Sequence, residues 1–310
     1  MAISLLGSHL GPLLFLIFIN DLPTVIESSK ILLFADDVKL FYSFSNDCAP
    51  LQNDLNNLVK WYKTNLMSFN LNKCKQMSFF RTSSPATTYH IDNFALESVD
   101  YFCDLGVHMD HKLNFNYHIE KIVNKASRTL GVIKRYAKEF RDPYATKLLF
   151  TSVVRPILEY ASVVWCPRYQ CHIDFLESVQ KQFLLFCLRH LGWDPNIPLP
   201  AYRSRLRLIR LPTLESRRKM LNVFFIFNFI NGKVSCECLL QRINFGVPAR
   251  PTRNTTNSNC SLLRLNYFVY NYLNFEPLRA AQVDFNNLYI HINFNMSSDS
   301  LKRSILAALN

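Results

Sequence analysis

Two adjacent carboxylates, Asp36 and Asp37, divide the apolar segment 31–42 into two short arms. Apolar and aromatic arms of this length are typical of β-strands, and the two acids fall where a tight turn would join them. The segment therefore predicts a strand–turn–strand unit. Most Asp-Asp pairs are solvated turn residues, so the pair alone leaves open whether it binds anything. Adjacent carboxylates repel each other unless a cation compensates them, and hard divalent ions such as Mg²⁺ prefer oxygen ligands.

The first third of the chain combines helical and alternating patterns. Residues 10–22 begin near Gly11 and continue as an apolar run, which predicts the start of a buried helix. Apolar residues recur at a helical period over 51–66, whereas residues 76–110 alternate and are broken by turn residues, which predicts short strands. We therefore expect a mixed α/β part over residues 1–113.

From about residue 114 onward, the apolar residues follow helical stripes, which predicts a mostly helical part. Asp142-Pro143 is typical of a helix start. Arg155-Pro156 predicts the end of that helix, because the residue before a proline disfavours helical conformation. Residues 246–260 are rich in Pro, Thr, Asn and Ser, which predicts a loop.

The positive charge of the chain is concentrated in one segment. The formal net charge is +12, and residues 121–220 contain 19 Lys and Arg against 7 Asp and Glu, which accounts for the whole excess of 12. A localised basic field attracts polyanions, and nucleic acid is the commonest such partner. A basic solvated surface is the alternative interpretation. The charge pattern favours nucleic-acid contact.

Cysteine usage and hydrophobicity indicate an intracellular protein of the cytoplasm or nucleus. The nine cysteines show no repeated pair at zinc-ligand spacing, which favours reduced thiols in an intracellular compartment. The apolar run Leu10–Ile19 is too short to span a bilayer as a helix and has no basic residues before it. We therefore expect no membrane partner.

The two acids are embedded in a series of short motifs that extends over residues 7–230. The motifs are Gly7-Ser8-His9-Leu10-Gly11-Pro12, Phe18-Ile19-Asn20-Asp21, Phe34-Ala35-Asp36-Asp37, Trp61 with Leu71-Asn72 and Lys75, Asp104-Leu105-Gly106, Val154-Arg155-Pro156, and Glu177-Ser178-Val179-Gln180-Lys181. In this order and spacing they resemble motifs B to E and the thumb of non-LTR retrotransposon reverse transcriptases, particularly jockey-like RNA-directed DNA polymerases. The resemblance implies an α+β fold. A partial polymerase palm would cover 1–113 and a helical thumb 114–200, followed by a C-terminal helical extension over 201–310 with a loop near 246–260.

The resemblance also implies roles for individual residues. Asp36 would be a Mg²⁺ ligand with Asp37 as the supporting acid, and Lys75 would lie near the triphosphate as a cation or proton donor. Backbone would approach the template and the incoming nucleotide at three small residues, Gly7, Ser8 and Gly11. Without the resemblance, a surface lysine and a helix start that needs small residues describe these positions better. The implied partners are an RNA template, a DNA primer and deoxynucleotide triphosphates.

The sequence also departs from the family pattern. In the family, another metal-binding Asp lies upstream in motif A, and only six residues precede Gly7 here. We therefore expect this chain to be a fragment that is inactive alone, because the fingers and motif A are missing. The alternative is a noncatalytic nucleic-acid-binding protein that uses the basic helical region.

Overall fold

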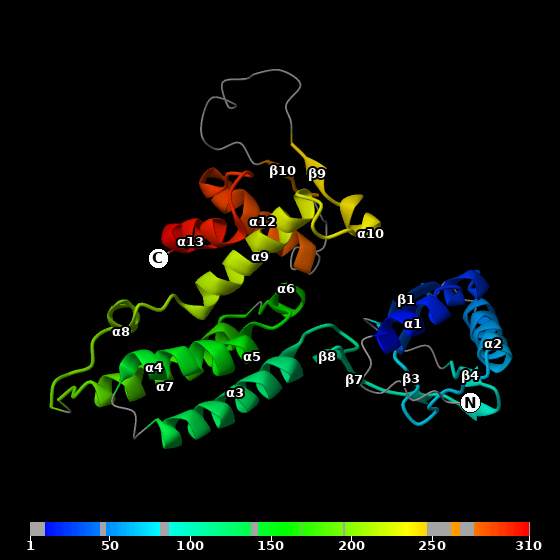
Figure 1. Cartoon of the computed structure of the whole chain (residues 1–310), viewed down its shortest axis with the longest axis horizontal. Coiled ribbons are helices and arrows are strands. Elements are labelled where there is room, and N and C mark those ends of the chain that lie inside the picture. The colour runs from blue at the N-terminus through cyan, green and yellow to red at the C-terminus, as the bar shows by residue number, and fades with distance from the viewer. Residues whose placement is uncertain are drawn as a thin grey trace. The chain divides into compact units, whose positions relative to one another are not determined.

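The computed structural model describes residues 10–43, 48–80, 87–137, 142–167, 169–194, 196–246, 262–266 and 276–309. The chain divides into two compact units, Met1–Asn114 and Phe115–Asn310, whose elements are labelled in Figure 1. The fold is mixed α+β, mostly helical with small two-stranded sheets. None of the described helices combines the length and the hydrophobicity needed to cross a bilayer.

The described residues of the first unit form two helices, a 3-10 turn and short strands. In chain order these are α1 (Leu10–Ile19), η1 (Leu22–Val25), β1 (Lys30–Phe34), β2 (Asp37–Phe41), α2 (Ala49–Thr64), β3 (Lys75–Gln76), β4 (His90–Ile91), β5 (Phe94–Ala95), β6 (Glu97–Ser98), β7 (Tyr101–Asp104) and β8 (Val107–Asp110). Three antiparallel pairs form between neighbours in sequence, β1 with β2, β4 with β5 and β7 with β8, whereas β3 pairs parallel with β6. The predicted strand–turn–strand unit at 31–42 is confirmed as the β1–β2 hairpin.

One buried cluster of this unit lies between α2 and the β1–β2 hairpin. Leu58, Trp61 and Tyr62 of α2 are buried together with Ile19 and Leu22. The inner face of the hairpin packs against them through alternate residues, Ile31, Leu33, Val38 and Leu40. This alternation follows the pleat, in which successive side chains point to opposite faces. Helix α2 therefore supports the hairpin from one side.

Helix α1 forms where the sequence predicts it, but the prediction that it is buried is wrong. Of the described residues of α1, only Ile19 is buried. Phe15 is half-buried. The remaining large apolar side chains are 44–66% exposed: Leu10, Leu13, Leu14, Leu16, Ile17 and Phe18. A helix that is apolar all round is usually buried. Here the described part of the unit meets only one edge of it, which a uniformly apolar sequence does not reveal.

The second unit is mostly helical. Its elements are α3 (Asn116–Tyr136), α4 (Pro143–Leu149), η2 (Phe150–Val154), α5 (Arg155–Glu159), α6 (Ser162–Trp165), α7 (Gln170–His190), α8 (Tyr202–Ile209), α9 (Leu214–Ile230), α10 (Glu237–Leu240), β9 (Asn244–Phe245), β10 (Leu263–Arg264), α12 (Pro277–Leu288), η4 (Tyr289–His291) and α13 (Ser298–Leu309). Figure 1 shows α12 and α13 against α9, and all three contribute buried apolar residues to one core. The loop predicted at 246–260 falls almost entirely outside the described residues.

The helix that begins at Pro143 does not end at Arg155-Pro156, contrary to the sequence prediction. Asp142 caps its start, because the carboxylate accepts hydrogen bonds from the backbone N–H groups of Tyr144 and Ala145 at 2.8 and 3.3 Å. The helical path then continues through the π-helical segment η2 into α5, whose first turn contains Pro156. A proline is tolerated in a first turn, where its missing N–H is not needed. The π-helical turn therefore lets the chain continue past the proline.

Candidate catalytic hairpin and nucleic-acid interface

The two acids lie at the bend of the β1–β2 hairpin. Phe34 pairs with Asp37 in the ladder, so Ala35 and Asp36 form a two-residue turn. Ala35 has a φ of 49°, in the left-handed region that L-residues other than Asn and Asp rarely adopt. Both carboxylates are exposed. The sequence prediction of their place at a hairpin bend is confirmed, whereas their role as metal ligands stays a prediction.

Asp54 of α2 anchors the chain just before β1. Its buried carboxylate, 1% exposed, accepts three consecutive backbone N–H groups, from Glu27 at 2.9 Å, Ser28 at 3.2 Å and Ser29 at 2.6 Å. Burial disfavours the ionised form, but these hydrogen bonds outweigh it and lower the pKa of Asp54 below the ordinary 3.8. Sequence reasoning missed this residue. The available signal was an aspartate next to Leu55 on the apolar stripe of a helix.

Asp54 should make the stability of the first unit depend on acid. Because folding lowers its pKa, the ionised carboxylate stabilises the unit fully above about pH 3.9. That stabilisation is lost as the pH falls through the pKa of the folded state. We expect Asp54→Asn to lower the free energy of unfolding by about 2 kcal/mol at pH 7 and to flatten the acid limb of its pH profile. The exposed Asp92 provides the matched control, because Asp92→Asn should change neither quantity by more than about 0.5 kcal/mol. Denaturant titrations from pH 2 to 7 measure both quantities. If the stability of Asp54→Asn fell with acid as steeply as that of the wild type, the role of Asp54 would be contradicted.

An ion pair links the acidic hairpin to the β7–β8 hairpin. Lys39 of β2 pairs with Asp104 at the end of β7, and both side chains are about one-fifth exposed (20% and 22%). The β7–β8 turn consists of Leu105 and Gly106, with φ values of 45° and 83°. Two positive φ values are what a type I′ hairpin turn requires, which gives Gly106 a conformational role. Asp104 therefore joins the two hairpins, whereas Gly106 allows the tight turn of one of them.

Lys75 lies in a different arrangement. Its ammonium group forms an ion pair with Glu97, on the strand β6 that pairs with β3. Its predicted role at the triphosphate stays a prediction. Gly11 is the second residue of α1, whereas Gly7 and Ser8 lie outside the described residues.

The carboxylate pair fits Mg²⁺ by chemistry but is not joined by further acids in the described part of the chain. Within these residues, no group of three or more His, Cys, Asp or Glu side chains is placed to hold a metal ion. Mg²⁺ often binds through one or two carboxylates, several waters and the phosphates of a substrate. Asp36 and Asp37 could supply the carboxylates of such a site.

Helix α3 of the second unit has two opposite faces. Ile119, Val123, Ala126, Leu130 and Ile133 form its buried stripe, with residues three or four positions apart. A second stripe is shifted by two residues, or about 200° around the helix. It is exposed and carries four basic side chains, Lys121, Lys125, Arg128 and Arg135. Among the described residues, none of these four has an ion-pair partner within 4.0 Å.

Two exposed aromatic residues flank this basic stripe. Tyr117 lies one turn before Lys121, whose ammonium is 5.0 Å from the ring centroid, and Tyr136 follows Arg135. Tyr117 is 38% exposed and Tyr136 67%. Glu120 is the single acidic residue in the sequence of α3. We call Lys121, Lys125, Arg128 and Arg135 the α3 basic face.

Two residues of the motif at 177–181 have a structural explanation. The buried carboxylate of Glu177 accepts the backbone N–H of Glu215 at 2.8 Å and the hydroxyl of Tyr202. Gln180, fully buried, donates to the carbonyl of Pro212 at 2.9 Å and to the hydroxyl of Tyr202 at 3.1 Å. These bonds join α7 to α8 and to the start of α9. A family-like motif here reflects a buried hydrogen-bond network rather than a surface site.

Comparison with known proteins agrees with these features. Residues 5–132 match the family model described as reverse transcriptase (RNA-dependent DNA polymerase). The chain is 29% identical over 191 residues to the probable RNA-directed DNA polymerase from transposon BS of Drosophila melanogaster. This alignment covers 57% of this chain and 21% of that protein. It is 23% identical to the RNA-directed DNA polymerase from mobile element jockey of the same organism, over 57% of this chain and 21% of that protein. No solved structure matches the chain.

A third relative, the probable RNA-directed DNA polymerase from transposon X-element of Drosophila melanogaster, is 23% identical over 57% of this chain and 20% of that protein. The chain therefore spans about a fifth of the length of these curated relatives. Residues 5–132 are therefore similar to the reverse transcriptase family, and the chain shows distant homology to part of the RNA-directed DNA polymerases of non-LTR retrotransposons.

Proposed function

We propose that this chain is a portion of an RNA-directed DNA polymerase of the non-LTR retrotransposon kind. Residues 1–113 form part of its palm, residues 114–200 its thumb, and residues 201–310 a C-terminal extension. The single observation that carries the proposal is the exposed carboxylate pair at the bend of a two-residue hairpin, within the segment that matches the family.

Asp36 and Asp37 hold Mg²⁺ in this proposal. The ion, when bound, activates the primer hydroxyl and stabilises the leaving pyrophosphate. The chain's own contribution is to hold two carboxylates at a rigid bend. That bend is supported by α2 beneath it, by Asp54 at the start of β1, and by the ion pair of Lys39 with Asp104.

The partners are an RNA template and a DNA primer, bound through the α3 basic face. Two further lysines of the second unit, Lys134 and Lys147, are partly buried near other basic side chains. Burial, and then the neighbouring Arg189, lower the pKa of Lys134. Burial, and then Arg210 and Arg155, lower the pKa of Lys147. The observation that supports a polyanion as partner is the α3 basic face, whose four side chains have no ion-pair partner among the described residues.

The metal assignment is tested by Mn²⁺ binding, followed by electron paramagnetic resonance. We expect Asp36→Asn to weaken Mn²⁺ binding by about tenfold or more, because one of two carboxylate ligands is lost. Asp92→Asn is the matched control, since Asp92 is also exposed and in a hairpin turn, and it should leave the affinity unchanged. Equal Mn²⁺ affinity of the wild type and Asp36→Asn would contradict the metal site.

Catalysis is tested by primer extension on an RNA template with Mg²⁺ and deoxynucleotide triphosphates. We expect no extension by this chain alone, because no third acid joins the pair in the described part of the chain. The same protein should still bind the primer–template in a gel-shift assay. Extension that Asp36→Asn abolishes would refute the expected inactivity and support the metal assignment, whereas extension that Asp36→Asn leaves unchanged would refute both.

A noncatalytic nucleic-acid-binding protein is the second candidate, and the α3 basic face is the observation that favours it. The two candidates differ in the hairpin. In a purely binding protein, substitution of Asp36 changes neither metal affinity nor the activity of a longer polypeptide that contains this segment.

A further inference from the structure

A hollow of about 550 Å³ lies on the first unit. Its lining residues follow the acidic bend by more than 30 residues in the sequence. It is lined by the loop between α2 and β3 and by one residue of β5: Ser68, Phe69, Asn70, Leu71, Asn72 and Phe94. The hollow is largely open to solvent, so it suits a group that belongs to a longer ligand rather than an enclosed small molecule. None of the six lining side chains is charged. The hollow therefore suits a neutral, partly polar ligand group.

The walls of the hollow are held by the folded core. Phe69 packs on the buried ring of Tyr62, with the ring centroids 4.0 Å apart. Leu71 packs against a second buried cluster that includes Leu55 and Ile91. The loop itself is closed by two backbone hydrogen bonds, from Lys73 to Asn70 at 2.9 Å and from Cys74 to Leu71 at 3.2 Å. A ligand would therefore meet a site that is largely formed in advance.

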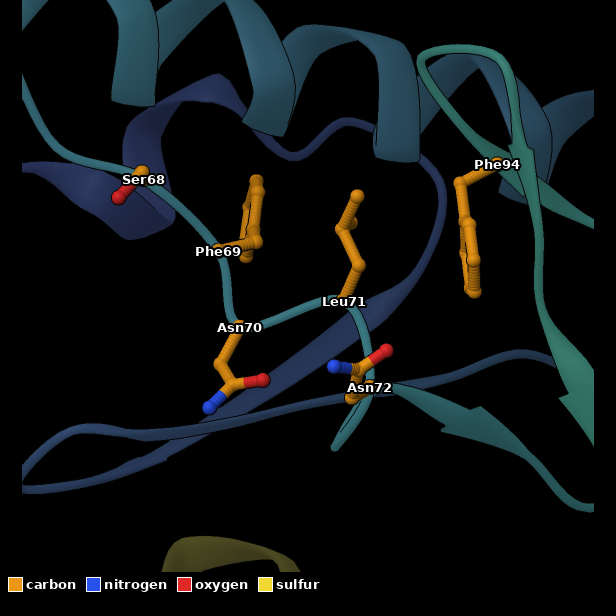
Figure 2. Close-up of a pocket in the computed structure, with 6 residues that line it drawn as sticks. All are labelled: Ser68, Phe69, Asn70, Leu71, Asn72 and Phe94. Atoms are coloured by element: carbon orange, nitrogen blue, oxygen red, sulfur yellow. The ribbon is translucent and has the colours of Figure 1, made fainter.

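Phe94 provides an aromatic wall on the other side. It lies in the short β4–β5 hairpin, where it pairs with the buried Ile91, and its side chain is 40% exposed. Figure 2 shows the ring of Phe94 across an opening from the side chain of Leu71, with the amide of Asn72 at one end of this opening. An exposed ring opposite an aliphatic side chain offers two flat surfaces to a planar group.

The amides of Asn70 and Asn72 give the hollow both hydrogen-bond donors and hydrogen-bond acceptors. Each amide offers two N–H donors and a carbonyl acceptor, and asparagine can form a paired donor–acceptor contact with adenine. Both residues are exposed. The next residue in the chain, Lys73, is also exposed and lacks an ion-pair partner within 4.0 Å among the described residues.

We propose that this hollow binds an unpaired nucleobase, with Phe94 stacking on the base, Asn72 contacting its polar edge, and Lys73 near the adjoining phosphate. The proposal rests on the proposed function, which makes nucleic acid the partner of the chain. Stacking of a base on an aromatic side chain tolerates every base, because every base has a π-face. A hollow of this kind holds single-stranded rather than duplex nucleic acid.

The test compares the affinity of the full chain for three probes: a twelve-nucleotide deoxyadenosine strand, a strand of the same length with abasic sites, and a duplex. We expect Phe94→Leu, which keeps the apolar bulk but removes the ring, to weaken binding of the deoxyadenosine strand by about tenfold. Binding of the abasic strand and of the duplex should not change. Phe94→Tyr should restore the wild-type affinity.

Phe79 provides the matched control, because it is an exposed phenylalanine (50%) of the same unit that does not line the hollow. Phe79→Leu should bind all three probes like the wild type. Equal affinity of Phe94→Leu and wild type for the deoxyadenosine strand would overturn the proposal, as would an equal loss with the abasic strand. If the wild type binds none of the probes, the proposed function itself fails, so the two failures are distinguishable.

A competition arm identifies the source of the base. Deoxyadenosine monophosphate at millimolar concentration should compete with the strand in the wild type but not in Phe94→Leu if the hollow takes free nucleotides. Failure to compete, together with the loss in Phe94→Leu, assigns the hollow to a base within a strand. Both results support a nucleobase site. Competition that is equal in the two proteins overturns it.

Discussion

Replacing the four residues of the α3 basic face, Lys121, Lys125, Arg128 and Arg135, with alanine should lower the affinity of the chain for a primer–template duplex by about 100-fold near 0.1 M salt. Each basic residue that neutralises a phosphate releases a counterion, so the slope of log affinity against log salt should fall by about one for each residue removed. Gel-shift titrations at several salt concentrations measure the affinity and the slope together.

A charge-matched control separates a specific interface from net charge. Lys30, Lys60, Lys63 and Lys112 are exposed lysines of the first unit, and their replacement by alanine removes the same four charges. We expect this variant to lose less than about fivefold in affinity, because it leaves the α3 basic face intact. An equal loss in both variants would mean that only the total charge matters, and the interface on α3 would be wrong.

Phe183→Ala should destabilise the second unit by about 3–5 kcal/mol. Phe183 of α7 is fully buried, and its ring stacks on that of Phe150, with centroids 4.1 Å apart and an interplanar angle of 14°. Truncation removes the buried surface of the ring and leaves a cavity that the surrounding helices fill only in part. Hydrogen exchange of the α3 and α7 amides measures the change in opening free energy for this unit alone.

The matched control for this substitution lies on the same helix. Phe175 is 40% exposed, so Phe175→Ala should change the opening free energy by less than about 1 kcal/mol. A loss below about 1 kcal/mol in Phe183→Ala would contradict the packing of α7 against the π-helical segment. Exchange in the first unit should be unaffected by either substitution.

Local patterns predicted the elements that carry the site. The alternation around Asp36 and Asp37 predicted a hairpin with the acids at its bend, because a strand period of two and a turn signal both lie within a few residues. The stripe that includes Ile119 and Val123 predicted α3 in the same way. Once that stripe is buried, helical geometry alone exposes the opposite face of the helix. The basic residues lie on that face, each shifted by two positions from a buried residue. The motifs, taken together, also predicted the family.

What the sequence could not predict depends on contacts between residues far apart in the chain. The exposure of α1 was missed, because its uniformly apolar sequence does not say how much of the helix a neighbour covers. The path past Pro156 required a π-helical turn whose buried face, Phe150 with Val154, is held by other helices. Asp54 became an anchor only because folding brings it to the backbone before β1.

The sequence by itself determined that this chain forms a hairpin with two acids at its bend, a series of amphipathic helices and a concentrated positive charge. It did so because side-chain periodicity and turn chemistry act over a few neighbouring residues. Only the tertiary structure decided that Glu177 is a buried hydrogen-bond acceptor, that Lys39 joins two hairpins, and that Phe94 faces Leu71 across a hollow. These outcomes depend on which side chains meet after folding, and no local pattern encodes a partner that lies 20 or more residues away.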